Sequence, residues 1–223
     1  MTMRGRPTVL TVLAQRGWVQ HRAADSGSDA MLNEIRWLGD SLGMRALGRA
    51  RALEEVVQPQ RSPEAHPRSL SARYGLDALP LHVELSHRPR PCRYLLLGCL
   101  APGAPRATTM LLDWRSLAFS SDDFQLLESA PVLVRTGRRS FYSTILSSDR
   151  TFLRYDPACV EGVEQRGRSA LQLLARRLSL ASSENHEWRQ DDILIIDNWR
   201  VLHGRGPSQL NSGRSLARIL IDA

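Results

Sequence analysis

Lysine is absent from this sequence: all 30 basic residues are arginine, against 23 acidic residues, which gives a formal net charge of +7. Aromatic residues are also scarce, at 6%, so few rings are present on which nucleic-acid bases could stack. Two interpretations of the charge stay open: a surface that binds polyanions, or a GC-rich coding bias that replaces lysine by arginine. The arginines are scattered, with no block of five or six, and we do not expect nucleic acid as a partner.

Long hydrophobic runs are also lacking. The longest, at 94–100 and 193–196, are strand-sized, whereas a membrane span needs about 18–20 apolar residues. The apolar stretch near the start is short and polar residues interrupt it, so no signal peptide is expected. Three cysteines without CxxC spacing, Cys92, Cys99 and Cys159, predict free, buried thiols in a reducing compartment. We therefore expect a cytoplasmic protein with no membrane partner.

The composition is that of a folded chain. Hydrophobic residues make up 42% and charged residues 24% of 223 residues, which excludes global disorder and a disulfide-stapled mini-protein. The length suits a single domain over 1–223. Within it we expect an N-terminal helical part and loop over 1–68, then a core over 69–223 with an inserted helix near 160–180.

The periodicity of apolar residues predicts the elements. Helical spacing runs from Asp29, a favourable N-cap, to Gly43. A second short helix is predicted over 47–57 and a strand over 8–13. After a loop rich in Pro and Ser, short apolar runs follow at 79–85, 93–100, 109–114, 132–136, 141–146, 151–155, 192–197, 200–203 and 214–221. This rhythm indicates antiparallel strands, and we predict a mainly β fold with helices, built on a double-stranded β-helix (jelly-roll) core.

One candidate for chemistry is the tripeptide His82-Val83-Glu84. Residues i and i+2 of a strand point to the same face, so both polar side chains could bind one metal ion. Alone, the pattern favours an ordinary strand with two polar residues facing solvent over a metal site. A second candidate, His203, ends a strand that follows a tight Asp-Asn corner. Together the three form the 2-His-1-carboxylate set that binds non-haem Fe(II) and leaves open positions on the metal.

The order and spacing of four segments resemble the superfamily of taurine dioxygenase and clavaminate synthase. These segments lie at 79–84, 109–113, 197–205 and 214–218. The resemblance covers roughly 69–221 and implies a jelly-roll oxygenase that depends on Fe(II) and 2-oxoglutarate. It also implies that His82, Glu84 and His203 are the catalytic metal ligands.

The resemblance assigns the co-substrate contacts as well. Thr109, 27 residues after His82, and Arg214, 11 residues after His203, would hold the far carboxylate of 2-oxoglutarate. Arg218 would share this anchoring or face an acidic group of the substrate, and which arginine is the main anchor stays open. The usual Gly-Gly before the threonine is missing, so Thr108 is a rival of Thr109.

The implied reaction oxidises an unactivated C–H bond by hydroxylation, desaturation or cyclisation, and it consumes O2 and releases succinate and CO2. Glu84 argues against halogenation, because related halogenases lack the carboxylate ligand. The expected substrate is a small, amino-acid-like or specialised metabolite, such as one in antibiotic biosynthesis, either free or tethered to a carrier protein. Two alternatives remain: a non-catalytic jelly-roll scaffold, motivated by the short chain and missing Gly-Gly, and a basic nucleic-acid-binding module.

Overall fold

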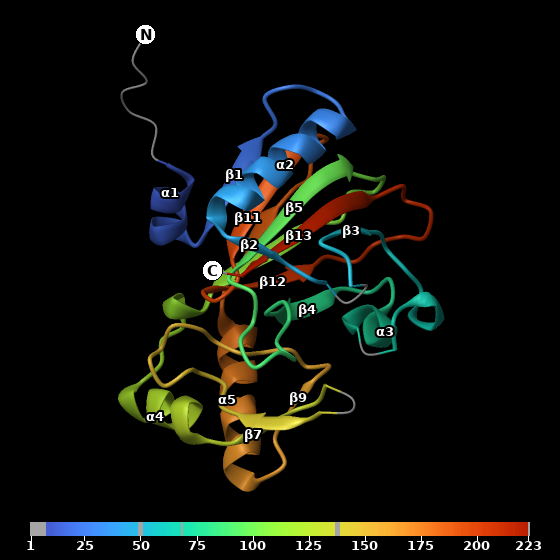
Figure 1. Cartoon of the computed structure of the whole chain (residues 1–223). Coiled ribbons are helices and arrows are strands. Elements are labelled where there is room, and N and C mark those ends of the chain that lie inside the picture. The colour runs from blue at the N-terminus through green and yellow to red at the C-terminus, as the bar shows by residue number, and fades with distance from the viewer. Residues whose placement is uncertain (1–7, 49–50, 68, 137–138, 223) are drawn as a thin grey trace.

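A computed structural model describes residues 8–48, 51–67, 69–136 and 139–222 (Figure 1). Two antiparallel sheets form the upper part of the molecule, and a smaller sheet with two helices lies below them. Among the described residues, no helix is long and apolar enough to cross a membrane. The architecture is mainly β with helices, as predicted.

The larger sheet has six strands. Its order begins β1 (Trp18–Arg22), β11 (Asp192–Asp197), β5 (Tyr94–Ala101) and β13 (Ser215–Asp222). The long strand β13 then pairs with two short ones, β2 (Met44–Ala46) and β3 (Glu54–Val57). All these pairs are antiparallel.

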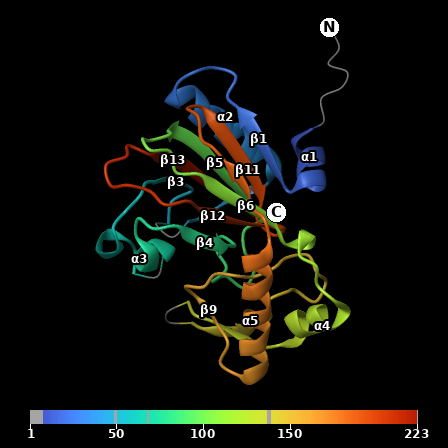
Figure 2. The same cartoon turned by 180° about the vertical axis from the view of Figure 1, so that it is seen from behind.

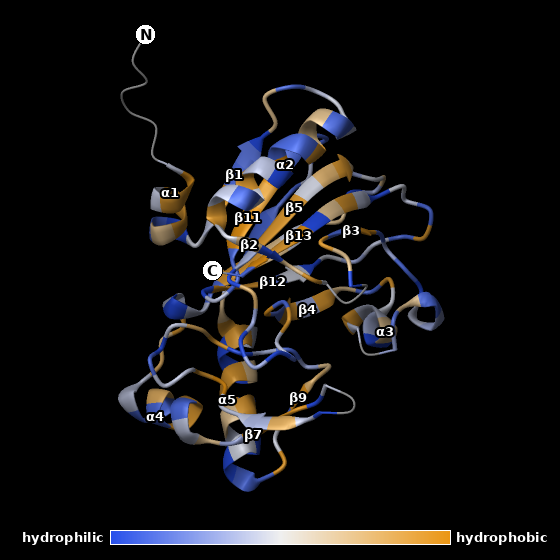
Figure 3. Ribbon diagram, viewed as in Figure 1, coloured by the Kyte–Doolittle hydropathy of each residue, from blue (hydrophilic) through white to orange (hydrophobic). Residues whose placement is uncertain are grey.

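The second sheet has four strands in the order β10 (Glu184–His186), β6 (Thr109–Asp113), β12 (Val201–Arg205) and β4 (Leu79–His82). It faces the larger sheet across a buried cluster that includes Leu111 and Val201 from one side and Leu194 and Leu216 from the other. Alternate residues of each strand point to opposite faces. Both faces of the larger sheet are covered, and its strands are mostly hydrophobic, as Figure 3 shows.

The outer face of the larger sheet is covered by α2 (Ser28–Leu42), as Figure 1 shows. Met31 and Ile35 of this helix are fully buried against the sheet. Gly98 of β5 permits the close approach, because a Cβ there would lie 2.3 Å from the sulfur of Met31. The helix α2 therefore covers the face of the larger sheet that points away from the four-stranded sheet.

The lower part contains α4 (Ser121–Ser129), α5 (Gln165–Leu180) and a three-stranded sheet of β8 (Phe141–Ser143), β7 (Val132–Val134) and β9 (Val160–Glu161). Its core continues onto the outer face of the four-stranded sheet through Leu112 and Leu202. Figure 2 shows α5 directly below the sheets. The remaining helices are α1 (Val9–Arg16), α3 (Leu70–Tyr74) and two 3-10 turns, η1 (Ser62–Glu64) and η2 (Trp114–Ser116).

Three predicted elements were wrong. The expected strand at 8–13 is α1, because the Thr8 hydroxyl accepts a hydrogen bond from the Thr11 N–H and caps a helix. The helix expected over 47–57 is not seen in the described residues of that range. Its last four residues form strand β3 instead, which pairs with β13. The run at 151–155 makes only an isolated bridge between Leu146 and Leu153.

The start of the inserted helix also differs from the prediction. The helix begins at Gln165 rather than near 160, because Val160 and Glu161 form a strand that pairs with β7.

Candidate metal and co-substrate site

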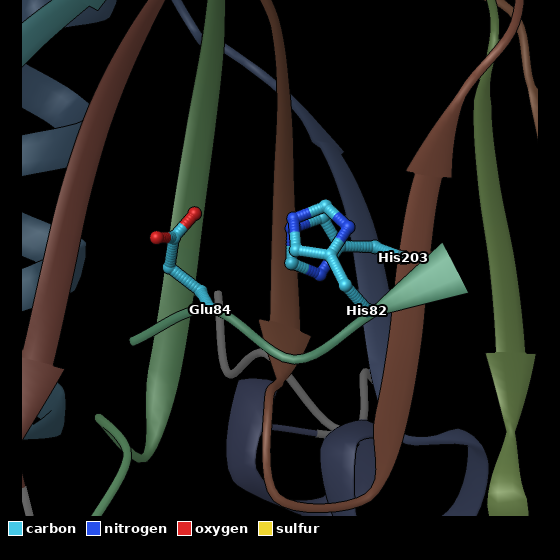
Figure 4. Close-up of side chains that lie close together, drawn as sticks. All are labelled: His82, Glu84 and His203. Carbon is cyan, nitrogen blue, oxygen red and sulfur yellow. The ribbon is translucent and has the colours of Figure 1, made fainter. Parts of the chain in front are cut away.

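The structure brings His82, Glu84 and His203 together between the two sheets. His82 ends β4 and lies directly opposite His203 of β12, and their ring centroids are 4.2 Å apart. Figure 4 shows the two imidazoles one over the other and the carboxylate beside them. One potential ligand atom from each residue lies within 4.8 Å of the other two, and the described part of the chain holds no second group of this kind.

The backbone around Glu84 is held from another part of the chain. The Glu84 N–H donates to Asn198 Oδ1 at 2.8 Å, and Asn198 Nδ2 donates to the Glu84 carbonyl at 3.0 Å. Asn198 Nδ2 also donates to the Cys92 carbonyl at 2.8 Å. Asn198 is fully buried and lies in the tight corner between β11 and β12. The corner that leads to His203 therefore also positions the carboxylate.

The orientation of His82 is set by its neighbouring backbone. Its Nδ1 lies 3.0 Å from the carbonyl oxygen of Pro80. A carbonyl can only accept, so Nδ1 carries a proton, and in the neutral ring the free lone pair is then on Nε2. This is the arrangement that a metal-binding imidazole commonly has, with one nitrogen donating and the other available.

His203 is suited to the neutral form that binds metals. It is 7% exposed, and its Nδ1 has no hydrogen-bond partner among the residues described. Burial, together with the neighbouring His82, lowers its pKa well below the ordinary value. A neutral imidazole and a carboxylate, placed side by side, are together a set of ligands that fits a divalent metal ion such as Fe(II).

Arg218 contacts Glu84 from the larger sheet. Its Nη1 lies 3.0 Å from Glu84 Oε2, and its Nε lies 3.1 Å from Glu55 Oε2. Burial alone would lower the pKa of Arg218, but the two carboxylates outweigh it and raise that pKa. The arginine is thus saturated by two acidic partners and forms one wall of the site.

Thr109 begins β6 of the four-stranded sheet, whereas Arg214 directly precedes β13 of the larger sheet. Thr109 is 3% exposed, lies opposite Arg205 in the pairing of β6 and β12, and accepts a hydrogen bond from Trp188 Nε1 at 2.9 Å. Thr108, its rival, is less buried, and its hydroxyl lies beside Gly206.

The guanidinium of Arg214 has no acidic partner in the described chain. It is 6% exposed, and its Nε makes no hydrogen bond there. Burial, then the charge of Arg205, lowers its pKa to about 10. A buried cation without a counter-charge is costly. It is therefore the feature expected of a site that receives an anion.

A cavity of about 330 Å³ opens on the site. His82, Glu84 and Arg218 line it, together with Ser69 and Ser71 at the start of α3. These two serines precede the first ligand strand in the sequence. Glu55 also lines the cavity, and sequence reasoning missed it because a helix was expected over 47–57.

Comparisons with known proteins agree with this geometry. Residues 119–220 match the family model described as taurine catabolism dioxygenase TauD, TfdA family. This match covers less than half of the chain, in its C-terminal part.

Two curated relatives are similar to parts of the chain. The tyrosine isonitrile desaturase of Pseudomonas aeruginosa is 29% identical over 111 residues, which is 47% of this chain and 38% of the relative. The 3-((Z)-2-isocyanoethenyl)-1H-indole synthase of Fischerella ambigua is 53% identical over 36 residues, which is 16% of this chain and 13% of the relative. The matched segments therefore span less than half the length of either relative.

Solved structures share the fold over nearly the whole chain. An asparagine oxygenase in complex with Fe(II), (2S,3S)-3-hydroxyasparagine and succinate superposes with a TM-score of 0.79 at 18% identity, covering 95% of this chain and 77% of that one. The non-haem iron oxygenase OrfP with Fe and α-ketoglutaric acid gives 0.74 at 22% identity, covering 94% and 76%. The prediction of a jelly-roll core is thereby confirmed.

Proposed function

We propose that the chain is an Fe(II)- and 2-oxoglutarate-dependent dioxygenase. The observation that carries the proposal is the convergence of three side chains onto one point: His82 from β4, Glu84 from the turn after β4 and His203 from β12. Two histidines and one carboxylate are the donor set of non-haem Fe(II) oxygenases. The relatives and structural neighbours, whose names describe oxygenases or desaturases, support the same reading.

The protein's own residues divide the work. His82 Nε2, the Glu84 carboxylate and His203 would hold the metal, and Asn198 fixes the backbone that carries Glu84. Bound Fe(II), with O2 and 2-oxoglutarate, supplies the oxidising power for an unactivated C–H bond, with succinate and CO2 as co-products. The apolar residues between the sheets exclude water from this chemistry.

Arg214 is the proposed anchor of 2-oxoglutarate. Its planar guanidinium can bind a carboxylate through two parallel hydrogen bonds, and no acidic side chain of the described chain neutralises it. Thr109, buried on the facing sheet, would donate its hydroxyl proton to the same carboxylate while still accepting from Trp188. Arg218 is the less suitable anchor, because Glu55 and Glu84 already occupy it.

The proposed substrate is a small, amino-acid-like molecule or specialised metabolite, with hydroxylation, desaturation or cyclisation as the outcome. Two structural neighbours were captured with hydroxylated amino acids, and one relative is a desaturase of an amino-acid isonitrile. Such a substrate would reach the site either free or tethered to a carrier protein. The three cysteines are unbridged and buried, which supports a reducing, cytoplasmic compartment.

The experiment is an anaerobic titration of the protein with Fe(II) and 2-oxoglutarate, followed by exposure to O2. Slow succinate formation without prime substrate, and its acceleration by an amino acid from a screened set, would support the proposal. A protein that binds neither Fe(II) nor 2-oxoglutarate would instead be the non-catalytic jelly-roll scaffold.

A further inference from the structure

A second, larger cavity of about 820 Å³ adjoins the candidate metal site. His66 and Ser69 line both cavities, so the two are neighbours. Its walls come from the segment before β3, from α3, and from the ends of β7 and β9. Figures 1 and 2 both show α3 and β9 on the same side of the molecule. Its volume lies within the range of small-molecule binding pockets.

The lining of this cavity is strongly basic. Of the residues that the structure describes, four arginines line it, Arg51, Arg73, Arg88 and Arg135, and Glu161 is the one acidic residue among them. Four arginines against one glutamate leave a net charge of +3 with the histidines neutral. Glu161 is already engaged, because its Oε1 lies 2.8 Å from Arg135 Nε.

Backbone carbonyls hold two of these arginines in place. Arg73 Nη1 donates to the Pro157 carbonyl at 2.6 Å, and Arg88 Nη2 donates to the carbonyl of Leu47. A carbonyl orients a guanidinium but does not neutralise its charge. Within the described residues no carboxylate pairs with either arginine. The cavity therefore presents oriented and uncompensated positive charge.

We propose that this arginine-lined cavity binds the phosphate group of a small-molecule phosphate ester whose other end reaches the metal site. The inference rests on the proposed function and names the substrate class: a free phosphate monoester with a carbon chain or ring to be oxidised. A monoester carries close to two negative charges and three acceptor oxygens, which suits several guanidinium groups from different elements. A phosphodiester arm of a carrier protein carries one charge and matches the +3 cavity less well.

The test is calorimetric titration of the full-length protein with inorganic pyrophosphate at low salt. We expect saturable binding that Arg73→Gln and Arg51→Gln each weaken about tenfold, since each removes a charged donor. Arg176→Gln is the matched control, because Arg176 is an exposed arginine of α5 that does not line the cavity.

Two further measurements separate charge from folding. Arg73→Lys keeps the charge and should retain more of the binding than Arg73→Gln, at an unchanged melting temperature. Phosphoserine, a monoester, should displace pyrophosphate at lower concentration than glycerophosphocholine, a diester. Equal binding by the cavity variants and the wild type would overturn the proposal, as would a diester that competes as well as the monoester.

Failure of the phosphate-site proposal can be told apart from failure of the oxygenase proposal, because pyrophosphate binding and succinate formation are measured separately. Pyrophosphate binding that depends on Arg73, in a protein without succinate formation, would keep the anion site and remove the oxygenase. Succinate formation in a protein that does not bind pyrophosphate would do the reverse.

Discussion

Asn198 hydrogen-bonds both the N–H and the carbonyl of Glu84, at 2.8 and 3.0 Å, although 114 residues separate them in the sequence. Asn198 lies at the corner between β11 and β12, and β12 carries His203. One buried amide therefore joins the segment of the carboxylate to the strand of a histidine.

Asn198→Ala should lower both stability and metal affinity. It leaves the Glu84 N–H and two carbonyls unpaired in the interior, at a cost of about 2–4 kcal/mol in the free energy of unfolding. Loss of a group that orients a ligand lowers metal affinity by about 10–100-fold. Urea denaturation and anaerobic Fe(II) titration measure the two effects. Asn185→Ala, at an exposed position of β10, is the control and should change neither.

His203→Ala should abolish Fe(II) binding and succinate formation while the protein stays folded. In the wild type, Fe(II) at a hundred times its Kd should stabilise the fold by about 2.7 kcal/mol, seen as a higher melting temperature. The variant should lack this increase. His21→Ala, which removes a histidine paired with Glu34 elsewhere on the larger sheet, should retain it. Wild-type turnover in the His203 variant would refute the ligand assignment.

Arg214→Gln should raise the 2-oxoglutarate requirement far more than the Fe(II) requirement. The lost charged pair corresponds to about 2–5 kcal/mol of co-substrate binding. Calorimetry of the Fe(II)-loaded protein without O2 gives the affinity directly. If 2-oxoglutarate binding is unchanged in this variant but falls in Arg218→Gln, the two arginines have exchanged the roles proposed for them.

The N-terminus of α4 supplies a pH-dependent contribution to stability. The Ser120 N–H and Arg177 hold the pKa of Asp123 below its ordinary value of 3.8, against the opposing effect of burial. The ionised carboxylate therefore stabilises the fold above about pH 4. That contribution is lost as the pH falls through the lowered pKa.

Asp123→Asn should cost about 0.5–1 kcal/mol of stability at pH 7, within the range for capping groups. The difference from wild type should shrink as the pH falls through the lowered pKa and Asp123 becomes protonated. Asp122→Asn, its exposed neighbour, controls for charge alone. A difference that does not change with pH over the acid range would show that the ionised carboxylate is not the source of the stability.

The sequence predicted the central strands because each is a short apolar run bounded by turn residues. β11 and β13 are examples, and they lie where the pattern placed them. The periodic pattern of the N-terminal part was a weaker guide to the type of element. Residues 54–57 follow a helix-like pattern, but pairing with β13, more than 150 residues away, makes them a strand.

The candidate site was predictable in its residue types but not in its supports. The spacing of His82 and Glu84 suggests a shared face, whereas Glu84 in fact lies just beyond the strand, before a left-handed residue, Leu85, with φ of 56°. Glu55 and Asn198 contact this site through long-range packing, which no local pattern records. The assignment of Thr109, Arg214 and Arg218 to the co-substrate stays a prediction.

The direct pairing of His82 with His203 has a consequence for how this protein can vary. A one-residue slip between β4 and β12 would turn one imidazole to the opposite side of the sheet and dismantle the constellation. Insertions in the loops of the lower part leave that alignment intact. The number of residues between the two histidines can therefore vary, whereas a single deletion inside either strand would destroy the metal site.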